Sequence, residues 1–107
     1  MKTIWGEKLN KSNVLTEYPR PQMMRESYMN LNGIWNYAIT ENENPPDCFD
    51  GEILVPFSPE CELSGVMRNL SPEQTLWYQR TLQLPSDFNV GKVILHFGAV
   101  DQIATVY

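Results

Sequence analysis

Two glutamates, Glu60 and Glu62, are the closest approach in this sequence to a catalytic carboxylate pair. Two carboxyl groups about 5 Å apart can divide the roles of acid and nucleophile, provided that the pKa of the acid is raised. Here both glutamates stand among turn-forming residues, and no pattern around them would raise a pKa. We therefore interpret them as loop residues, and the sequence predicts no catalytic residue.

The other reactive side chains are equally sparse. His96 is the single histidine, expected on an outward face, and one imidazole without an acid or nucleophile makes no catalytic set. Cys48 and Cys61 stand thirteen positions apart without a CxxC motif, so we expect neither a metal nor a cofactor. Two free thiols are typical of a reducing compartment, whereas a disulfide across the intervening turn would require an oxidising one.

The composition is that of an ordinary globular chain. Of its 107 residues, 42% are apolar and 20% are charged, which indicates neither disorder nor a membrane protein. The net charge of -5 argues against a nucleic-acid partner, because such binding needs clustered lysine and arginine. No apolar run approaches the roughly 18 residues of a membrane-spanning helix, and the N-terminus lacks the apolar stretch of a secretory signal. With Met1 as the native start, we expect a cytoplasmic protein.

The chain divides into a lead-in and a strand-rich part. Residues 1–26 include two prolines and follow neither a strand period nor a helix period, so we expect an extended segment there. An aromatic or large apolar side chain can anchor such a segment without regular structure around it. The candidate anchors are Trp5, Leu15 and Tyr18.

Residues 27–107 predict an all-β domain of about five strands, with no convincing helix. An Asn-Gly turn precedes the first alternating run, and prolines or turn formers separate the runs that follow. The expected strands lie at 35–39, 51–57, 76–84, 93–100 and 101–107. Between the second and third is a long loop, from Ser58 to Gln74, and a loop of that length is more often functional than merely connective.

Several side chains on these strands have an expected environment. Trp35 could be a platform for a sugar ring, but its alternation with apolar neighbours favours the core. Trp77 and Tyr78 point to opposite faces, and we expect Tyr78 to be the core residue of the two. Arg80 shares the face of Tyr78, so its guanidinium should find a carboxylate or carbonyl partner, with Asp101 as one candidate.

Four blocks of the sequence, in this order, resemble one family: "LNGIWNYAI", "ILVPFSPECELSGV", "LWYQRTLQLP" and "VILHFGAVDQIATVY". They are similar to the N-terminal sugar-binding domain of glycoside hydrolase family 2, which includes β-galactosidases and β-glucuronidases. The resemblance implies a jelly-roll-like (galactose-binding-like) β-sandwich. Residues 27–107 would be the first part of that sandwich, which would be incomplete at its C-terminal end. Downstream, it implies an immunoglobulin-like domain and a TIM barrel.

The resemblance also implies a function for the parent enzyme. Such enzymes are retaining hydrolases of terminal β-glycosides, and both catalytic glutamates lie on the barrel, outside this chain. The sandwich supports the barrel and lends a loop to the rim of the active site. Here that loop is Ser58 to Asn69, in which Glu60, Ser64 and Gly65 match the family pattern. Glu60 and Ser64 are therefore the candidate substrate-binding residues, in a fragment that is itself inactive.

Two departures and two alternatives accompany this interpretation. Cys61 stands where the pattern has serine and Glu62 where it has alanine, which puts any polar contact through Cys61 in doubt. The main alternative is a free-standing, non-catalytic carbohydrate-binding module, and a third is an interaction sandwich without a sugar role. The expected partner is a carbohydrate, bound through the parent enzyme, and a homo-oligomer stays open.

Overall fold

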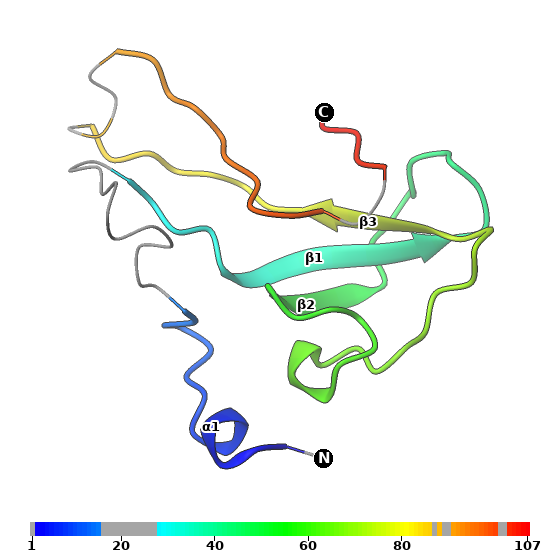
Figure 1. Cartoon of the computed structure of the whole chain (residues 1–107). Helices are drawn as coiled ribbons and strands as arrows, with labels where there is room; N and C mark the ends of the chain where they lie inside the picture. Colours follow the sequence, from blue (N-terminus) through cyan, green and yellow to red (C-terminus); the bar gives the residue numbers. More distant parts are fainter. Residues whose placement is uncertain (1, 16–27, 87, 89–90, 101–102) are drawn as a thin grey trace.

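The fold is built on one small antiparallel sheet, seen in a computed structural model that describes residues 2–15, 28–86, 88, 91–100 and 103–107. Three strands form the sheet in the order β2-β1-β3: β1 is Gly33–Thr40, β2 is Gly51–Val55 and β3 is Thr75–Gln79 (Figure 1). Helical structure in the described residues is limited to α1, Ile4–Glu7, and the 3-10 turn η2, Glu62–Ser64. The predicted all-β character is confirmed.

Strand β1 is the central strand because it pairs with β2 on one side and with β3 on the other, and hydrogen bonds fix both of its ends. The Asn30 side chain accepts a bond from the Asn32 amide at 2.8 Å, and Gly33 follows with a φ of 132° that favours glycine. At the other end, the Asp50 carboxylate accepts a bond from the Ile39 amide at 2.9 Å. The hairpin pairs Gly33 with Val55 through Tyr37 with Gly51, which confirms the first two predicted strands.

One face of the sheet is rich in aromatic and branched side chains. Residues directly opposite one another across a ladder share a face, so the register groups β1 residues with their partners on β2 and β3. We call this set the aromatic face: Trp35, Tyr37, Ile39, Ile53, Val55, Leu76 and Tyr78. Ile53 is fully buried on it, while Leu54 and Ala38 are buried on the opposite face.

Two predictions about this face need correction. Trp35 is half-buried rather than enclosed in a core, and Tyr78, expected to be the core residue, has 42% of its surface exposed. Trp77, on the opposite face, is the more buried of the two neighbours. Its indole N–H donates to the Thr40 hydroxyl at 2.8 Å, and its ring stacks on Tyr107 with centroids 6.3 Å apart. Trp77 therefore has a hydrogen-bond partner and a neighbouring ring, whereas the described partner ring of Tyr78 is Trp35.

The third predicted strand is shorter than expected. Its ladder with β1 stops at the pair Asn36–Gln79, so β3 ends at Gln79 and residues 80–85 are irregular. Leu82 and Leu84 continue the sequence alternation, yet they are 45% and 40% exposed. Alternation alone does not extend a strand beyond its hydrogen-bonded neighbour.

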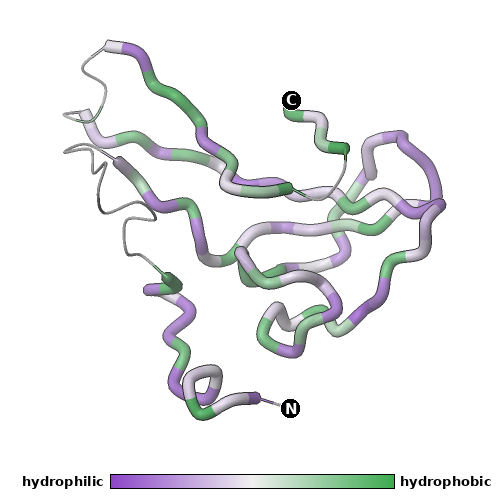
Figure 2. The backbone as a smooth tube through the Cα atoms, viewed as in Figure 1, coloured by the Kyte–Doolittle hydropathy of each residue, from purple (hydrophilic) through white to green (hydrophobic). Residues whose placement is uncertain are grey.

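The last two predicted strands are not formed in the described residues 93–100 and 103–107, which are irregular and exposed throughout. Figure 2 shows hydrophobic stretches on this part of the chain, outside the sheet. The alternating pattern is present, but no ladder in the described residues pairs it with another strand. Residues 101 and 102 lie outside the described ranges.

In its described part, the lead-in is ordered at a residue that the sequence did not single out, Val14. Thr3 begins α1 by accepting a bond from the Gly6 amide at 3.2 Å, so a single helical turn stands where an extended segment was expected. Trp5 and Leu15 are exposed, while Val14 is 1% exposed and its carbonyl accepts a bond from the Asn32 side chain at 3.2 Å. The buried Val14, with its carbonyl bonded to the Asn32 side chain, is therefore the anchor in the described part of the lead-in. Tyr18 lies outside the described residues.

Candidate functional site

The loop between β2 and β3 is irregular in sequence but ordered by its own backbone. The Cys61 amide donates to the Ser58 carbonyl at 3.0 Å, and the Ser64 amide donates to the Cys61 carbonyl at 3.1 Å. The Arg68 amide closes the loop by donating to the Pro59 carbonyl at 3.0 Å. The loop is therefore a compact turn structure that can hold a side chain in a defined place.

Ser64 is the structural centre of this loop. Its side chain is 3% exposed, and its hydroxyl donates to the Cys61 carbonyl at 2.7 Å while accepting from the Val66 amide at 3.1 Å. Gly65, directly after it, has a φ of 84°, a left-handed conformation that suits glycine. Both hydrogen-bonding roles of the Ser64 hydroxyl are thus used inside the loop. Substrate contact by Ser64 stays a prediction, and the geometry favours a structural role.

Glu60, the other predicted substrate-binding residue, is exposed on the same loop. Its charge acts on the aromatic face: burial raises the pKa of the Tyr78 phenol, and the negative charge of Glu60 raises it further. The carboxylate therefore lies within electrostatic reach of β3. Ser64 orders the loop that carries Glu60.

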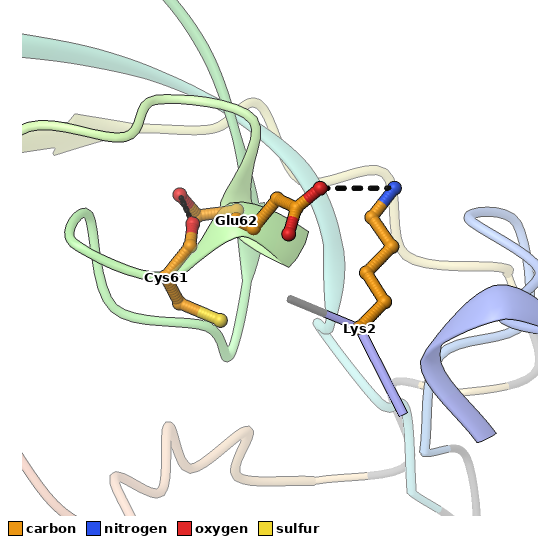
Figure 3. A network of polar contacts seen from close by, with 4 residues as sticks. Lys2, Cys61 and Glu62 are labelled. Carbon is orange, nitrogen blue, oxygen red and sulfur yellow. Dashed lines mark hydrogen bonds and ion pairs between the residues drawn. The ribbon is translucent and has the colours of Figure 1, made fainter. Parts of the chain in front are cut away.

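Glu62 points elsewhere, toward the lead-in. Its carboxylate lies 3.9 Å from the ammonium of Lys2, as Figure 3 shows, and both side chains are more than one-third exposed. Glu60 and Glu62 therefore face different neighbours rather than one shared reaction centre. This supports the interpretation that they are loop residues rather than a catalytic pair.

Arg80 makes a constellation that the sequence indicated only in part. Its Nη1 donates to the carbonyls of Leu31 and Asn32, the latter at 3.3 Å, which confirms the expected carbonyl partner. The guanidinium carbon also lies 5.8 Å from the ring centroid of Trp35. Trp35 in turn meets Tyr78 edge to face, with centroids 6.3 Å apart and planes at 89°. Asp101, the other candidate partner, lies outside the described residues.

Two hollows in the described part of the chain were not predicted. The first, of about 280 Å³, lies between residues 29–31 and residues 80–83 and includes Arg80 in its wall. The second, of about 290 Å³, lies between the lead-in and the loop and is mostly apolar. Its large lining side chains are Trp5, Leu9, Leu15, Phe57 and Leu63. Both hollows join segments far apart in sequence, so no local pattern could indicate them.

The remaining reactive residues are placed as follows. His96 is exposed, as predicted, and Cys48 and Cys61 are free thiols, the first of the two expectations for them. Within the described ranges, no three His, Cys, Asp or Glu side chains gather closely enough to hold a metal ion. The described helices are also too short to cross a membrane.

Comparison of the sequence with models of known protein families gives no match, and comparison with curated proteins gives none either. The resemblance to glycoside hydrolase family 2 therefore stays a prediction, and the function is argued below from the residues and their geometry.

Proposed function

We propose that this chain is the amino-terminal sheet of a retaining β-glycosidase of the family 2 type, supporting a catalytic barrel outside the chain. In this proposal the parent enzyme hydrolyses terminal β-galactosides or β-glucuronides. The observation that carries it is the exposed carboxylate of Glu60, held on a loop that the buried Ser64 hydroxyl orders. An acidic side chain on an ordered, outward loop can contribute a hydrogen-bond acceptor to the rim of a sugar pocket.

A β-sandwich is the proposed complete fold. The aromatic face includes Tyr78, which is 42% exposed, and Trp35 and Tyr37, which are only half-buried. A sheet with one strongly apolar face reaches a stable state by packing that face against a second layer, about 10 Å away. A jelly roll would provide that layer, and the alternating residues 93–100 are candidates to contribute to it.

The proposed role of Glu60 is to bind substrate, and it takes no part in proton transfer. A carboxylate accepts hydrogen bonds from sugar hydroxyls, and these bonds are about twice as strong as those between neutral groups. Placed at the rim, it would hold the outermost sugar and restrict the pocket to chain ends. Acid, base and nucleophile would come from the barrel.

The test is carried out on the protein encoded by the complete reading frame that contains this sequence. We expect hydrolysis of a nitrophenyl β-galactoside or β-glucuronide, and Glu60→Gln should raise KM by about three- to tenfold with kcat unchanged. Glu73→Gln is the matched control, because Glu73 is exposed at the far end of the same connection. A reading frame that encodes no barrel, or equal KM values for the two variants, would contradict the proposal.

A second candidate function is a free-standing carbohydrate-binding module. The observation that favours it is Trp5, which is 77% exposed and lines the apolar hollow beside the loop. An exposed indole packs against the CH face of a pyranose as it does against other apolar groups. In this case galactose or glucuronic acid at millimolar concentration would shift the tryptophan fluorescence, and Trp5→Ala would abolish the shift. An unchanged spectrum would reject the module.

We also propose the cytoplasm as the compartment of the protein. Support comes from Cys48 and Cys61, which are free thiols in the structure, because paired cysteines are favoured in oxidising compartments. Thiol labelling of the protein taken directly from its native cells would test this. Resistance to labelling that reductant reverses would contradict it.

A further inference from the structure

The hollow beside Arg80 has features of a binding site that the proposed function does not use. It lies where the segment entering β1 meets the segment leaving β3, and its volume is about 280 Å³. Arg80, Thr81 and Gln83 provide its polar wall, and Met29, Leu31 and Leu82 its apolar wall. A small number of polar groups converging in a partly apolar hollow is the usual composition of a small-molecule site.

The guanidinium of Arg80 is held in place before any ligand arrives. Its guanidinium carbon lies over the Trp35 ring, 5.8 Å from the ring centroid, and Nη1 donates to the carbonyls of Leu31 and Asn32. Trp35 is fixed in the same way, since its indole N–H donates to the Leu31 carbonyl at 2.7 Å. An arginine held by two hydrogen bonds and an aromatic neighbour loses less rotamer freedom on binding than an arginine without such contacts.

The remaining edge of that guanidinium is available. Its Nε and Nη2 groups have no hydrogen-bond partner in the described part of the chain, where Arg80 bonds through Nη1 alone. Two parallel N–H groups on a planar guanidinium match the two oxygens of a carboxylate. Among the described residues that line the hollow there is no aspartate or glutamate, so none of these side chains competes for that edge.

We propose that this hollow binds a small hydroxylated carboxylate, with the Nε and Nη2 edge of Arg80 gripping the carboxylate. Thr81 and Gln83 then hydrogen-bond the ligand's hydroxyl group, and Leu82 contacts its carbon atoms. The site is separate from the Glu60 loop and does not depend on the proposed glycosidase function. Because Arg80 is exposed and the chain carries a net charge of -5, we expect a dissociation constant on the order of 10 mM.

The test uses glycolate as the probe and glycolamide as its neutral analogue, added to the 15N-labelled chain at constant ionic strength. Glycolate should shift the Arg80 Nε–H resonance and the backbone amides of Thr81 and Gln83, with saturation, and glycolamide should not. Arg80→Lys keeps the charge but removes the planar fork, so affinity should fall by about tenfold. Arg68→Lys, an exposed arginine outside the hollow, is the matched control and should bind as the parent does.

Because Arg80 also holds the start of β1, the amide spectrum of each variant must keep the β1 and β3 resonances. If Arg80→Lys loses them, Gln83→Leu replaces it, since Gln83 lines the hollow and is not paired in the sheet. Gln83→Leu should then weaken glycolate binding by about threefold. Equal shifts with glycolate and glycolamide, or unchanged glycolate affinity in a folded variant, would overturn the proposal.

Discussion

Strand β2 and residues 93–97 have similar runs of apolar residues but different surroundings. In β2, Ile53 and Leu54 are 0% and 1% exposed, while Ile94 and Leu95 are 61% and 48% exposed. Each β2 residue has a partner on β1, whereas no ladder in the described chain includes residues 93–97. A hydrophobic pattern thus predicts which residues can share a face of a sheet. Whether those side chains are buried depends on whether a neighbouring strand pairs with them.

The largest expected effect comes from removing the same side chain in the two regions. Ile53→Ala should lower the free energy of unfolding by about 2–5 kcal/mol, because it deletes buried methyl groups and leaves a cavity. Ile94→Ala should change it by less than about 0.5 kcal/mol, because that side chain is already in solvent. Urea denaturation followed by circular dichroism measures both values.

This pair of variants can also break the comparison. If Ile94→Ala destabilised the chain as much as Ile53→Ala, residues 93–97 would be packed in solution despite their exposure here. The dependence of the unfolding free energy on urea concentration, the m-value, reports the surface exposed on unfolding. A different m-value for the two variants would also indicate that residues 93–97 are packed in the folded chain.

A smaller effect is expected in the loop, which is irregular in sequence and yet ordered. Ser64→Ala removes the hydroxyl that accepts from the part-buried Val66 amide, so the free energy of unfolding should fall by about 1 kcal/mol. Ser58→Ala, at an exposed position of the same loop, should cost less than about 0.5 kcal/mol. Thermal melts of the two variants measure the difference, and equal melting temperatures would show that Ser64 does not order the loop.

The two regions also explain what the sequence could predict. The β1 and β2 strands were predictable because the Asn-Gly turn and the alternation of Trp35, Tyr37 and Ile39 agree with the pairing that forms. The ends of β3 and the exposure of residues 93–100 were not, since they depend on which strands are adjacent. The position of the candidate loop along the sequence was predicted, but its internal hydrogen bonds were not. The Ser64 hydroxyl bonds within its own loop, to residues three positions before and two after it, but the loop showed no period from which those bonds could be predicted. The hollow at Arg80 joins residues about fifty positions apart, which no local spacing relates.

A still smaller effect is expected where the lead-in meets the loop. Lys2→Met removes the ion pair with Glu62, but both partners are exposed and their charges are screened by water and salt. The denaturation midpoint should therefore match that of Lys8→Met, an exposed lysine of the same segment, within experimental error. A lower midpoint for Lys2→Met that disappears in high salt would show that the pair fixes the lead-in on the loop.

The smallest effect concerns Tyr78, which joins the ordered loop to the aromatic face. Burial and then the charge of Glu60 raise the pKa of its phenol above the usual 10.0, so the folded chain holds that proton more tightly than the unfolded chain does. Stability is therefore independent of this group below about pH 10 and falls as the pH rises through and beyond the unfolded pKa. The absorbance of the phenolate, taken as the difference from Tyr78→Phe, should show a midpoint above pH 10.

Glu60→Gln should lower that midpoint toward the ordinary value, because it removes the charge and keeps the shape, whereas Glu73→Gln should leave it unchanged. An identical midpoint in all three proteins would mean that the loop carboxylate does not reach the sheet. The ordered loop and the aromatic face would then be independent regions, without the link on which the proposed rim of the sugar pocket rests.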